Sequence, residues 1–163
     1  MPYPGILMND KVLVAYFTKE GASEEYANII ADALTAKGLS VEKYNLANEI
    51  PDVTAYEAVV LGTGVKMSIV YRRWKKILKQ KSLDSKQLFM FLSSGMAIEE
   101  PDGAIDKFLN PIIKKYGLKP KSLGSFPGKI PDKWAKLDEQ KETMEPDKAK
   151  AWADEIASLI QSK

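Results

Sequence analysis

Residues 12–23 read VLVAYFTKEGAS, and this stretch decides the fold. Residues 12–17 form an unbroken apolar run, which is typical of a strand that is buried on both faces. Residues 18–23 then turn the chain toward residues 23–37, where apolar residues have helical spacing and Ser23 is a candidate N-cap. A turn between a buried strand and a helix N-terminus gathers free backbone N–H groups at the positive end of the helix dipole. The stretch therefore predicts an anion site, with an ordinary polar turn as the alternative.

Length and composition predict one globular domain. The chain has 163 residues, of which 45% are apolar and 28% are charged, and these values suit a single domain over residues 1–163 with residues 1–10 as a lead-in. A net charge of +2 is too small to indicate a nucleic-acid partner. The sequence has neither Cys nor His, which excludes thiol and imidazole catalysis and Cys- or His-ligated metals. We predict no catalytic side chain, no metal site, no membrane span, no signal peptide and a cytoplasmic location.

Apolar periodicity predicts alternating strands and helices. The strands are expected at residues 11–17, 40–45, 58–61, 88–92 and 121–126, and the main helices at 23–37, 69–80, 103–116 and 146–161. Pro111 is expected to kink or restart the third of these helices. This alternation is typical of an α/β fold in which helices cover both faces of a five-stranded parallel sheet. Right-handed crossovers favour the strand order 2-1-3-4-5 in a three-layer domain.

Three loops rich in Gly, Ser and Thr follow the central strands. They cover residues 18–23, 63–68 and 93–96. In a doubly wound sheet such loops meet at the carboxyl ends of the strands, beside the switch point where ligands bind. For residues 62–64 a tight turn with positive φ is the alternative.

Other nucleotide-binding patterns of this fold class are absent. The first loop lacks G-x-G-x-x-G, the chain has no G-x-x-x-x-G-K-[ST], and no Asp ends the third strand. The loop Thr18-Lys19-Glu20-Gly21-Ala22-Ser23 instead resembles the flavodoxin phosphate loop, [TS]-x-T-G-x-[TS], with Glu20 where many flavodoxins carry Thr. Residues 60–66 and 150–156 are similar to the flavodoxin-domain group that includes the menaquinone-dependent protoporphyrinogen dehydrogenases. The resemblance covers nearly the whole chain.

The resemblance implies a flavodoxin-like fold that binds FMN through all three loops. The expected phosphate ligands are the backbone and hydroxyl groups of Thr18, Lys19, Gly21, Ala22 and Ser23, while Glu20 points outward or accepts a backbone hydrogen bond. The expected flavin contacts are Thr63, Gly64, Val65, Lys66 and Met67 on one side of the ring, and Ser93, Ser94 and Gly95 on the other. The protein then positions the ring and tunes its potential, and the flavin supplies the electron chemistry.

The implied function is electron transfer between a reductant and a partner protein or small oxidant. Two alternatives stay open, namely an FMN-dependent oxidoreductase of the quinone-coupled protoporphyrinogen dehydrogenase type and a non-redox module that binds a phosphate ligand. Carrier flavodoxins are usually acidic, whereas this chain has a basic cluster around Arg72 and Arg73. That cluster is either a solvated helix face or a docking surface for an anionic partner or a membrane.

Overall fold

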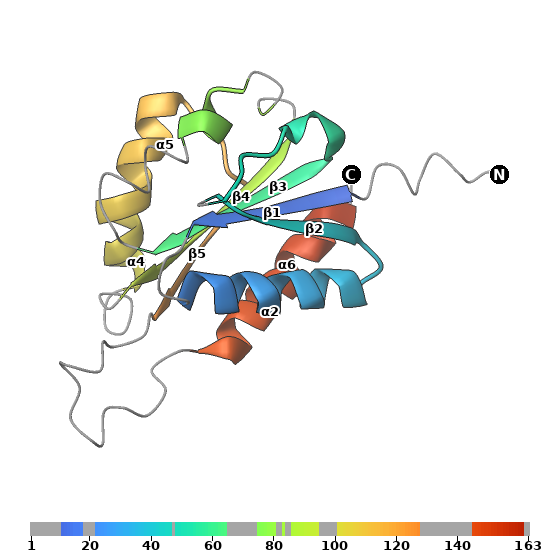
Figure 1. Ribbon diagram of the computed structural model, residues 1–163. Helices are drawn as coiled ribbons and strands as arrows, with labels where there is room; N and C mark the ends of the chain where they lie inside the picture. The colour runs from blue at the N-terminus through green and yellow to red at the C-terminus, as the bar shows by residue number, and fades with distance from the viewer. Residues whose placement is uncertain are drawn as a thin grey trace.

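The computed structural model describes residues 11–17, 22–46, 48–64, 75–80, 83, 86–94, 101–127 and 145–161. Its elements are β1 (Lys11–Phe17), α2 (Ala22–Ala36), β2 (Ser40–Asn45), the 3₁₀ turn η1 (Val53–Ala55), β3 (Ala58–Gly64), β4 (Gln87–Ser94), α4 (Pro101–Ala104), the π-helical η4 (Ile105–Leu109), α5 (Asn110–Tyr116), β5 (Ser122–Pro127) and α6 (Pro146–Gln161). The five strands are parallel and lie in the order β2-β1-β3-β4-β5, which confirms the predicted topology. Figure 1 shows α2 and α6 on one face of the sheet and α4 and α5 on the other.

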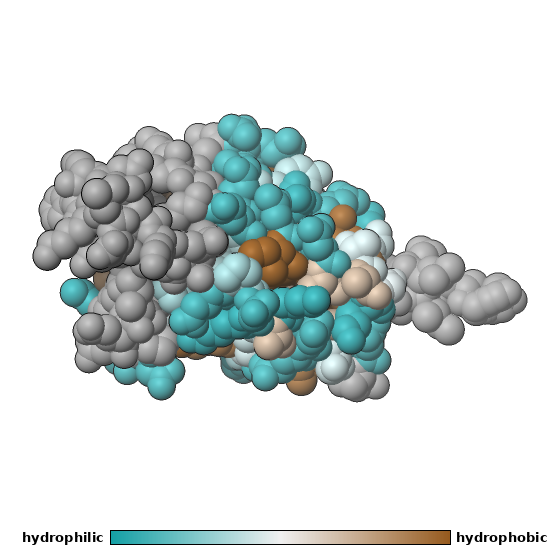
Figure 2. Space-filling view, turned by 90° about the horizontal axis from the view of Figure 1, so that it is seen from below, coloured by the Kyte–Doolittle hydropathy of each residue, from teal (hydrophilic) through white to brown (hydrophobic). Residues whose placement is uncertain are grey.

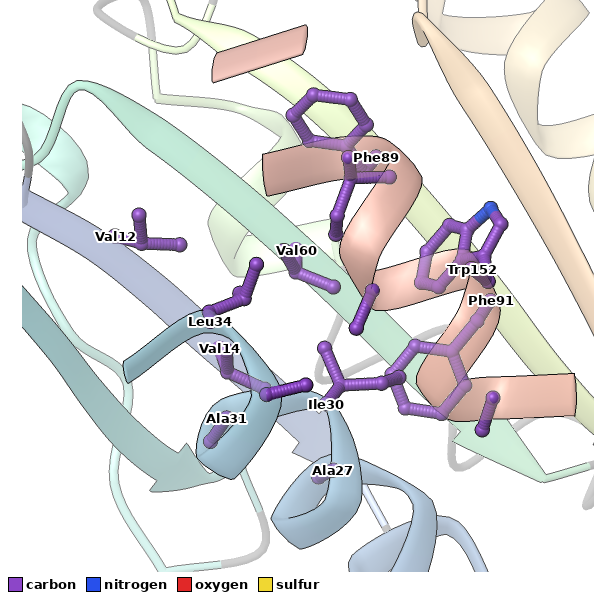
Figure 3. Packing of buried hydrophobic residues seen from close by; sticks show 14 of the residues in the cluster. Val12, Val14, Ala27, Ile30, Ala31, Leu34, Val60, Phe89, Phe91 and Trp152 are labelled. Carbon is purple, nitrogen blue, oxygen red and sulfur yellow. The ribbon is translucent and has the colours of Figure 1, made fainter. Parts of the chain in front are cut away.

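The core has two halves, one on each face of the sheet. On the α2–α6 face, strand residues such as Val14, Val60 and Phe91 point toward Ile30 of α2 and Trp152 of α6 (Figure 3). Consecutive residues of a strand point to opposite faces, and every residue from Val12 to Phe17 is at least 94% buried. The unbroken apolar run of β1 is therefore explained by the two helix layers.

The α4–α5 face is packed by the alternate strand residues. Leu13, Leu61 and Met90 lie there against Leu109 and other apolar residues of the helix layer. The predicted helix over residues 69–80 contributes to this layer. Residues 75–78 are helical and bury Ile77 and Leu78 as predicted, while its first half lies outside the described residues.

Strands β3 and β4 extend beyond their predicted ends at Leu61 and Leu92. They continue to Gly64 and Ser94, and the ladder between them pairs Gly62 with Phe91. A Cβ atom on Gly62 would lie only 2.0 Å from Cζ of Phe91. The tight-turn interpretation of Gly62 is therefore wrong, because this glycine lies within the strand and leaves room for an aromatic ring.

The helical segment from Pro101 to Tyr116 contains a π turn just before Pro111. The N–H of Asn110 donates to the carbonyl of Ile105, five residues earlier, and α5 begins at Asn110. In a regular α-helix the proline ring would clash with the carbonyl four residues before it, and a wider turn avoids that contact. The structure thus accommodates Pro111 in a helical segment that continues through the π turn and returns to α-helical geometry at Asn110.

Most other element bounds agree with the sequence. Helix α6 occupies the predicted residues, and Gly38 follows α2 with a φ of 92°, as expected of a C′ glycine. Helix α2 begins at Ala22, one residue earlier than predicted, so Ser23 lies in its first turn rather than before it. Among the described helices, none is both long enough and apolar enough to cross a bilayer.

Candidate functional site

Buried polar side chains collect at one edge of the sheet. In the described part of the chain they are Thr63, Ser93 and Ser125, with exposed fractions of 2%, 4% and 5%. Each lies in the last three residues of its strand, β3, β4 or β5. Burial of a hydroxyl needs a compensating partner, so their common position identifies the carboxyl edge as the polar end of the buried parts of β3, β4 and β5.

The ladder brings the ends of β1, β3 and β4 side by side. Phe17 is the register partner of Thr63, and Gly64 is the partner of Ser93. Thr63 continues the series of residues that face α4 and α5, whereas Ser93 continues the series that faces α2 and α6. The edge therefore presents small polar residues toward both helix layers, as a site between loops from neighbouring strands requires.

The N-terminus of α2 lies at the same edge. Strand β1 ends at Phe17 and the helix begins at Ala22, so a short connection joins them. The first turn of a 15-residue helix offers N–H groups that lack helical partners, together with the positive end of the dipole. This is the geometry that the sequence predicts for an anion site.

Two carboxylates also occupy this turn, at Glu24 and Glu25. The hydroxyl of Tyr16 donates to Oε2 of Glu24 at 3.3 Å. Burial, and then the negative charge of Glu24, raises the pKa of Tyr16, which keeps the phenol a neutral donor. A helix dipole stabilises these carboxylates, but they repel an anion. A bound anion must therefore contact the backbone groups ahead of them.

The predicted site residues divide into two groups. The structure describes the side chains of Thr63 and Ser93 and brings them to neighbouring strand ends. It places the backbone of Ala22, Ser23, Gly64 and Ser94 at the same edge. Outside the described residues lie Thr18, Lys19, Glu20, Gly21, Val65, Lys66, Met67 and Gly95, together with Arg72 and Arg73 of the basic cluster.

Ser125 is a polar residue of this edge that the sequence analysis does not identify. Its Oγ atom is buried and has no hydrogen-bond partner among the residues that the structure describes. Ser125 lies in the strand sequence SLGSFP, where a lone serine before an apolar residue is not a distinguishing pattern.

We expect the change Ser125→Ala to raise the free energy of unfolding by about 1 kcal/mol, because a buried hydroxyl without a partner carries a desolvation cost. The matched control is Ser122→Ala in the same strand. Ser122 Oγ accepts from Trp152 Nε1 at 2.9 Å and donates to Glu155 Oε2 at 3.0 Å, so its loss should lower stability. Urea denaturation measures both. A decrease for Ser125→Ala would show that its hydroxyl has a partner, such as a water molecule.

Comparisons with known proteins agree with this architecture. A family model described as "Flavodoxin domain" matches residues 13–141. The flavodoxin from Streptococcus pneumonia TIGR4 is 17% identical to this chain, with a TM-score of 0.62. The match covers 91% of this chain and 99% of that flavodoxin. Flavodoxin 2 from Bacillus cereus is 21% identical, with a TM-score of 0.62. The match covers 91% of this chain and 97% of that flavodoxin.

A larger protein contains a similar domain. The rubredoxin oxygen:oxidoreductase from Desulfovibrio gigas is 16% identical with a TM-score of 0.65, and the match covers 94% of this chain but only 37% of that one. No curated protein matches the sequence. At these identities the solved structures show the fold alone, whereas the family model covers more than half of the chain. The chain belongs to the flavodoxin domain family.

Proposed function

We propose that this protein binds FMN at the carboxyl edge of its sheet and transfers electrons between a reductant and a partner protein or small oxidant. The observation that carries the proposal is the concentration of buried polar side chains at the ends of β3 and β4, beside the N-terminus of α2. A switch point of this kind is where doubly wound sheets hold their ligands. The flavodoxin family match supports FMN as the ligand.

The residues at this edge fit the two chemical parts of FMN. The N–H groups of the first turn of α2 suit the phosphate, and Ser23 lies in that turn. The ends of β3 and β4 suit the polar edge of the flavin ring, because buried hydroxyls and backbone groups of Thr63 and Ser93 lie there. When bound, FMN supplies the one- and two-electron chemistry. The chain binds the phosphate, orients the ring and excludes water from its inner face.

The absence of His and Cys from the sequence agrees with this division of roles. An electron carrier needs no side chain that gains or loses a proton near neutral pH, since the flavin accepts and delivers the electrons. Tyr16, whose hydroxyl donates to Glu24 in the first turn of α2, stays protonated, because its pKa is raised. We therefore assign binding and orienting roles, and no catalytic role, to the residues at this edge.

The test is the absorption spectrum of the purified protein and its titration with FMN. We expect a yellow protein that absorbs near ~450 nm. Because binding depends on the phosphate group of FMN, riboflavin should bind more weakly than FMN. A colourless protein that does not take up added FMN would contradict the proposal. Steady-state turnover of a porphyrinogen with a quinone would instead assign the protein to the oxidoreductase alternative.

Ser23→Ala should weaken FMN binding by about 1–3 kcal/mol, which is the range for losing a hydrogen bond to a charged group. The control is Ser158→Ala on α6, an exposed serine whose hydroxyl donates to the backbone oxygen of Asp154. Fluorescence titration of apoprotein with FMN measures both variants. Equal affinities for the two would place the phosphate away from the first turn of α2.

A further inference from the structure

The helix layer formed by α4, η4, α5 and the helical residues 75–78 carries a dense set of exposed lysines. We call this set the lysine face, and it consists of Lys75, Lys76, Lys79, Lys107, Lys114, Lys115 and Lys119. The described acidic residues of the same helices are Asp102 and Asp106, both near the start of the α4–η4 segment. The positive charge therefore increases along this layer toward the amino end of the sheet, where α5 ends.

Among the described residues, no carboxylate forms an ion pair with these lysines. In the described ranges, the ion pair that forms joins Lys11 to Glu42, at 3.5 Å, on strands β1 and β2 rather than on these helices. The ammonium groups of Lys107 and Lys115 lie over the rings of Phe108 and Tyr116, at 5.4 and 5.6 Å from the ring centroids. Such contacts leave the charge unchanged, so the lysine face keeps a positive potential.

A cleft of about 340 Å³ opens at the amino end of the lysine face. Its walls are formed by Leu83, Lys86, Leu88, Gly117, Leu118 and Lys119. Leu83 and Leu88 are 96% buried and form an apolar floor. The Lys86 ammonium is held at the rim by a hydrogen bond of 3.1 Å to the carbonyl of Thr54. An apolar floor between two ammonium groups fits a ligand that carries an anionic group on an apolar body.

The opposite helix layer has a different surface. Helices α2 and α6 carry a mixture of charges, with Glu24, Glu25, Asp32, Asp147, Asp154 and Glu155 beside Lys37, Lys148 and Lys150. Figure 2 views the molecule from the side of these helices and shows a mainly hydrophilic face with small, separate hydrophobic areas. In the described part of the chain, the uncompensated positive charge is therefore concentrated on the α4–α5 layer.

We propose that the lysine face docks on a bilayer that contains anionic phospholipids. Two separate segments of the chain, residues 75–79 and 107–119, supply its lysines, which suits an extended anionic surface better than a single small anion. The cleft between Lys86 and Lys119 provides a place for one headgroup and its apolar stem. Basic clusters of this size bind anionic membranes through the summed attraction of their charges.

The position of the lysine face favours a membrane over an acidic redox partner. Lys86 precedes β4 and Lys119 precedes β5, so both lie at the amino end of the sheet, opposite the proposed FMN edge. A redox partner bound at this end would lie far from the flavin, whereas a bilayer there leaves the flavin edge free. Docking itself does not require FMN, so this proposal and the proposed function can fail separately.

The test is co-sedimentation with phosphatidylcholine vesicles prepared with and without phosphatidylglycerol. We expect binding only to the anionic vesicles, with release at high salt. The triple change Lys114→Gln, Lys115→Gln and Lys119→Gln should lower the partition coefficient on the order of 100-fold, since each lysine near an anionic leaflet contributes about fivefold. Glutamine and lysine have similar helix propensities, so α5 should keep its structure. Circular dichroism verifies this.

The matched control is Lys37→Gln, Lys148→Gln and Lys150→Gln on the opposite layer, which removes the same net charge. It should change the partition coefficient less than fivefold, because these side chains face away from the bilayer. An equal decrease in the partition coefficient for the two triple variants would show that binding depends only on net charge, and would overturn the proposal. Absence of binding of the wild-type protein to anionic vesicles at low salt would also overturn it. Binding to soluble poly-L-glutamate without vesicle binding would assign the lysine face to an acidic protein instead.

Discussion

Replacing Gly62 with alanine is expected to lower the free energy of unfolding by about 3 kcal/mol. The new Cβ would lie 2.0 and 2.1 Å from Cζ and Cε2 of Phe91, and Phe91 is completely buried. The ring cannot move aside easily, because it also contacts Phe126 and Trp152, with both centroid distances at 6.1 Å. Close-packed interiors relax little around an added methyl group. Urea denaturation, monitored by circular dichroism, measures the change.

A double-mutant cycle identifies the cause of this loss. Phe91→Leu removes the ring atoms that an alanine at position 62 would meet, although it destabilises the protein by itself. In the Phe91→Leu background, Gly62→Ala should cost less than 1 kcal/mol, which gives a coupling energy of about 2 kcal/mol. Additive effects would show that Gly62 is required for its backbone conformation and not for the ring of Phe91.

Local patterns in the sequence were sufficient to predict the architecture of the sheet. The run from Val12 to Phe17 identified the central strand, and the stripe of Ala149, Trp152 and Ile156 identified α6 with its observed bounds. These features depend on contacts whose periodicity is visible in one segment. The ends of β3 and β4 depend on contacts between segments. Gly62 reads as a turn residue until its register partner Phe91 is known, and this pairing is a property of the sheet.

The location of the candidate site could be predicted from local sequence patterns, but not all of its residues could. The short polar loops after β1, β3 and β4 indicated the carboxyl edge, and the structure brings Thr63 and Ser93 there. Ser125 was missed because a lone serine in an edge strand has no distinguishing pattern in one sequence. Its burial comes from the neighbouring helix layers, which the strand's own residues do not specify. The lysine face was only partly visible, since its members come from separate segments that the fold brings onto one layer.

Tyr26→Phe should lower the free energy of unfolding by about 3 kcal/mol, because one hydroxyl connects two segments that are far apart in the sequence. The Tyr26 hydroxyl donates to the carbonyl of Pro127, at the end of β5, and accepts from the N–H of Glu145, just before α6. Tyr26 is completely buried, and its ring lies 5.0 Å from that of Phe126. The phenylalanine ring preserves this packing, so the loss reports the two hydrogen bonds.

Tyr116→Phe is the matched control for this prediction. Tyr116 is half-buried in the last turn of α5, where it packs against the apolar core of the α4–α5 face and beside the ammonium of Lys115. Removing this hydroxyl should change the free energy of unfolding by less than about 0.5 kcal/mol. A similarly small loss of unfolding free energy in both variants would mean that hydrogen bonds to water replace those of Tyr26 at little cost. A large loss for Tyr26→Phe alone would show that α2 holds the end of β5 and the start of α6 together. Because α2 also supplies the proposed phosphate site, FMN should then raise the unfolding midpoint of the wild type and of this variant alike.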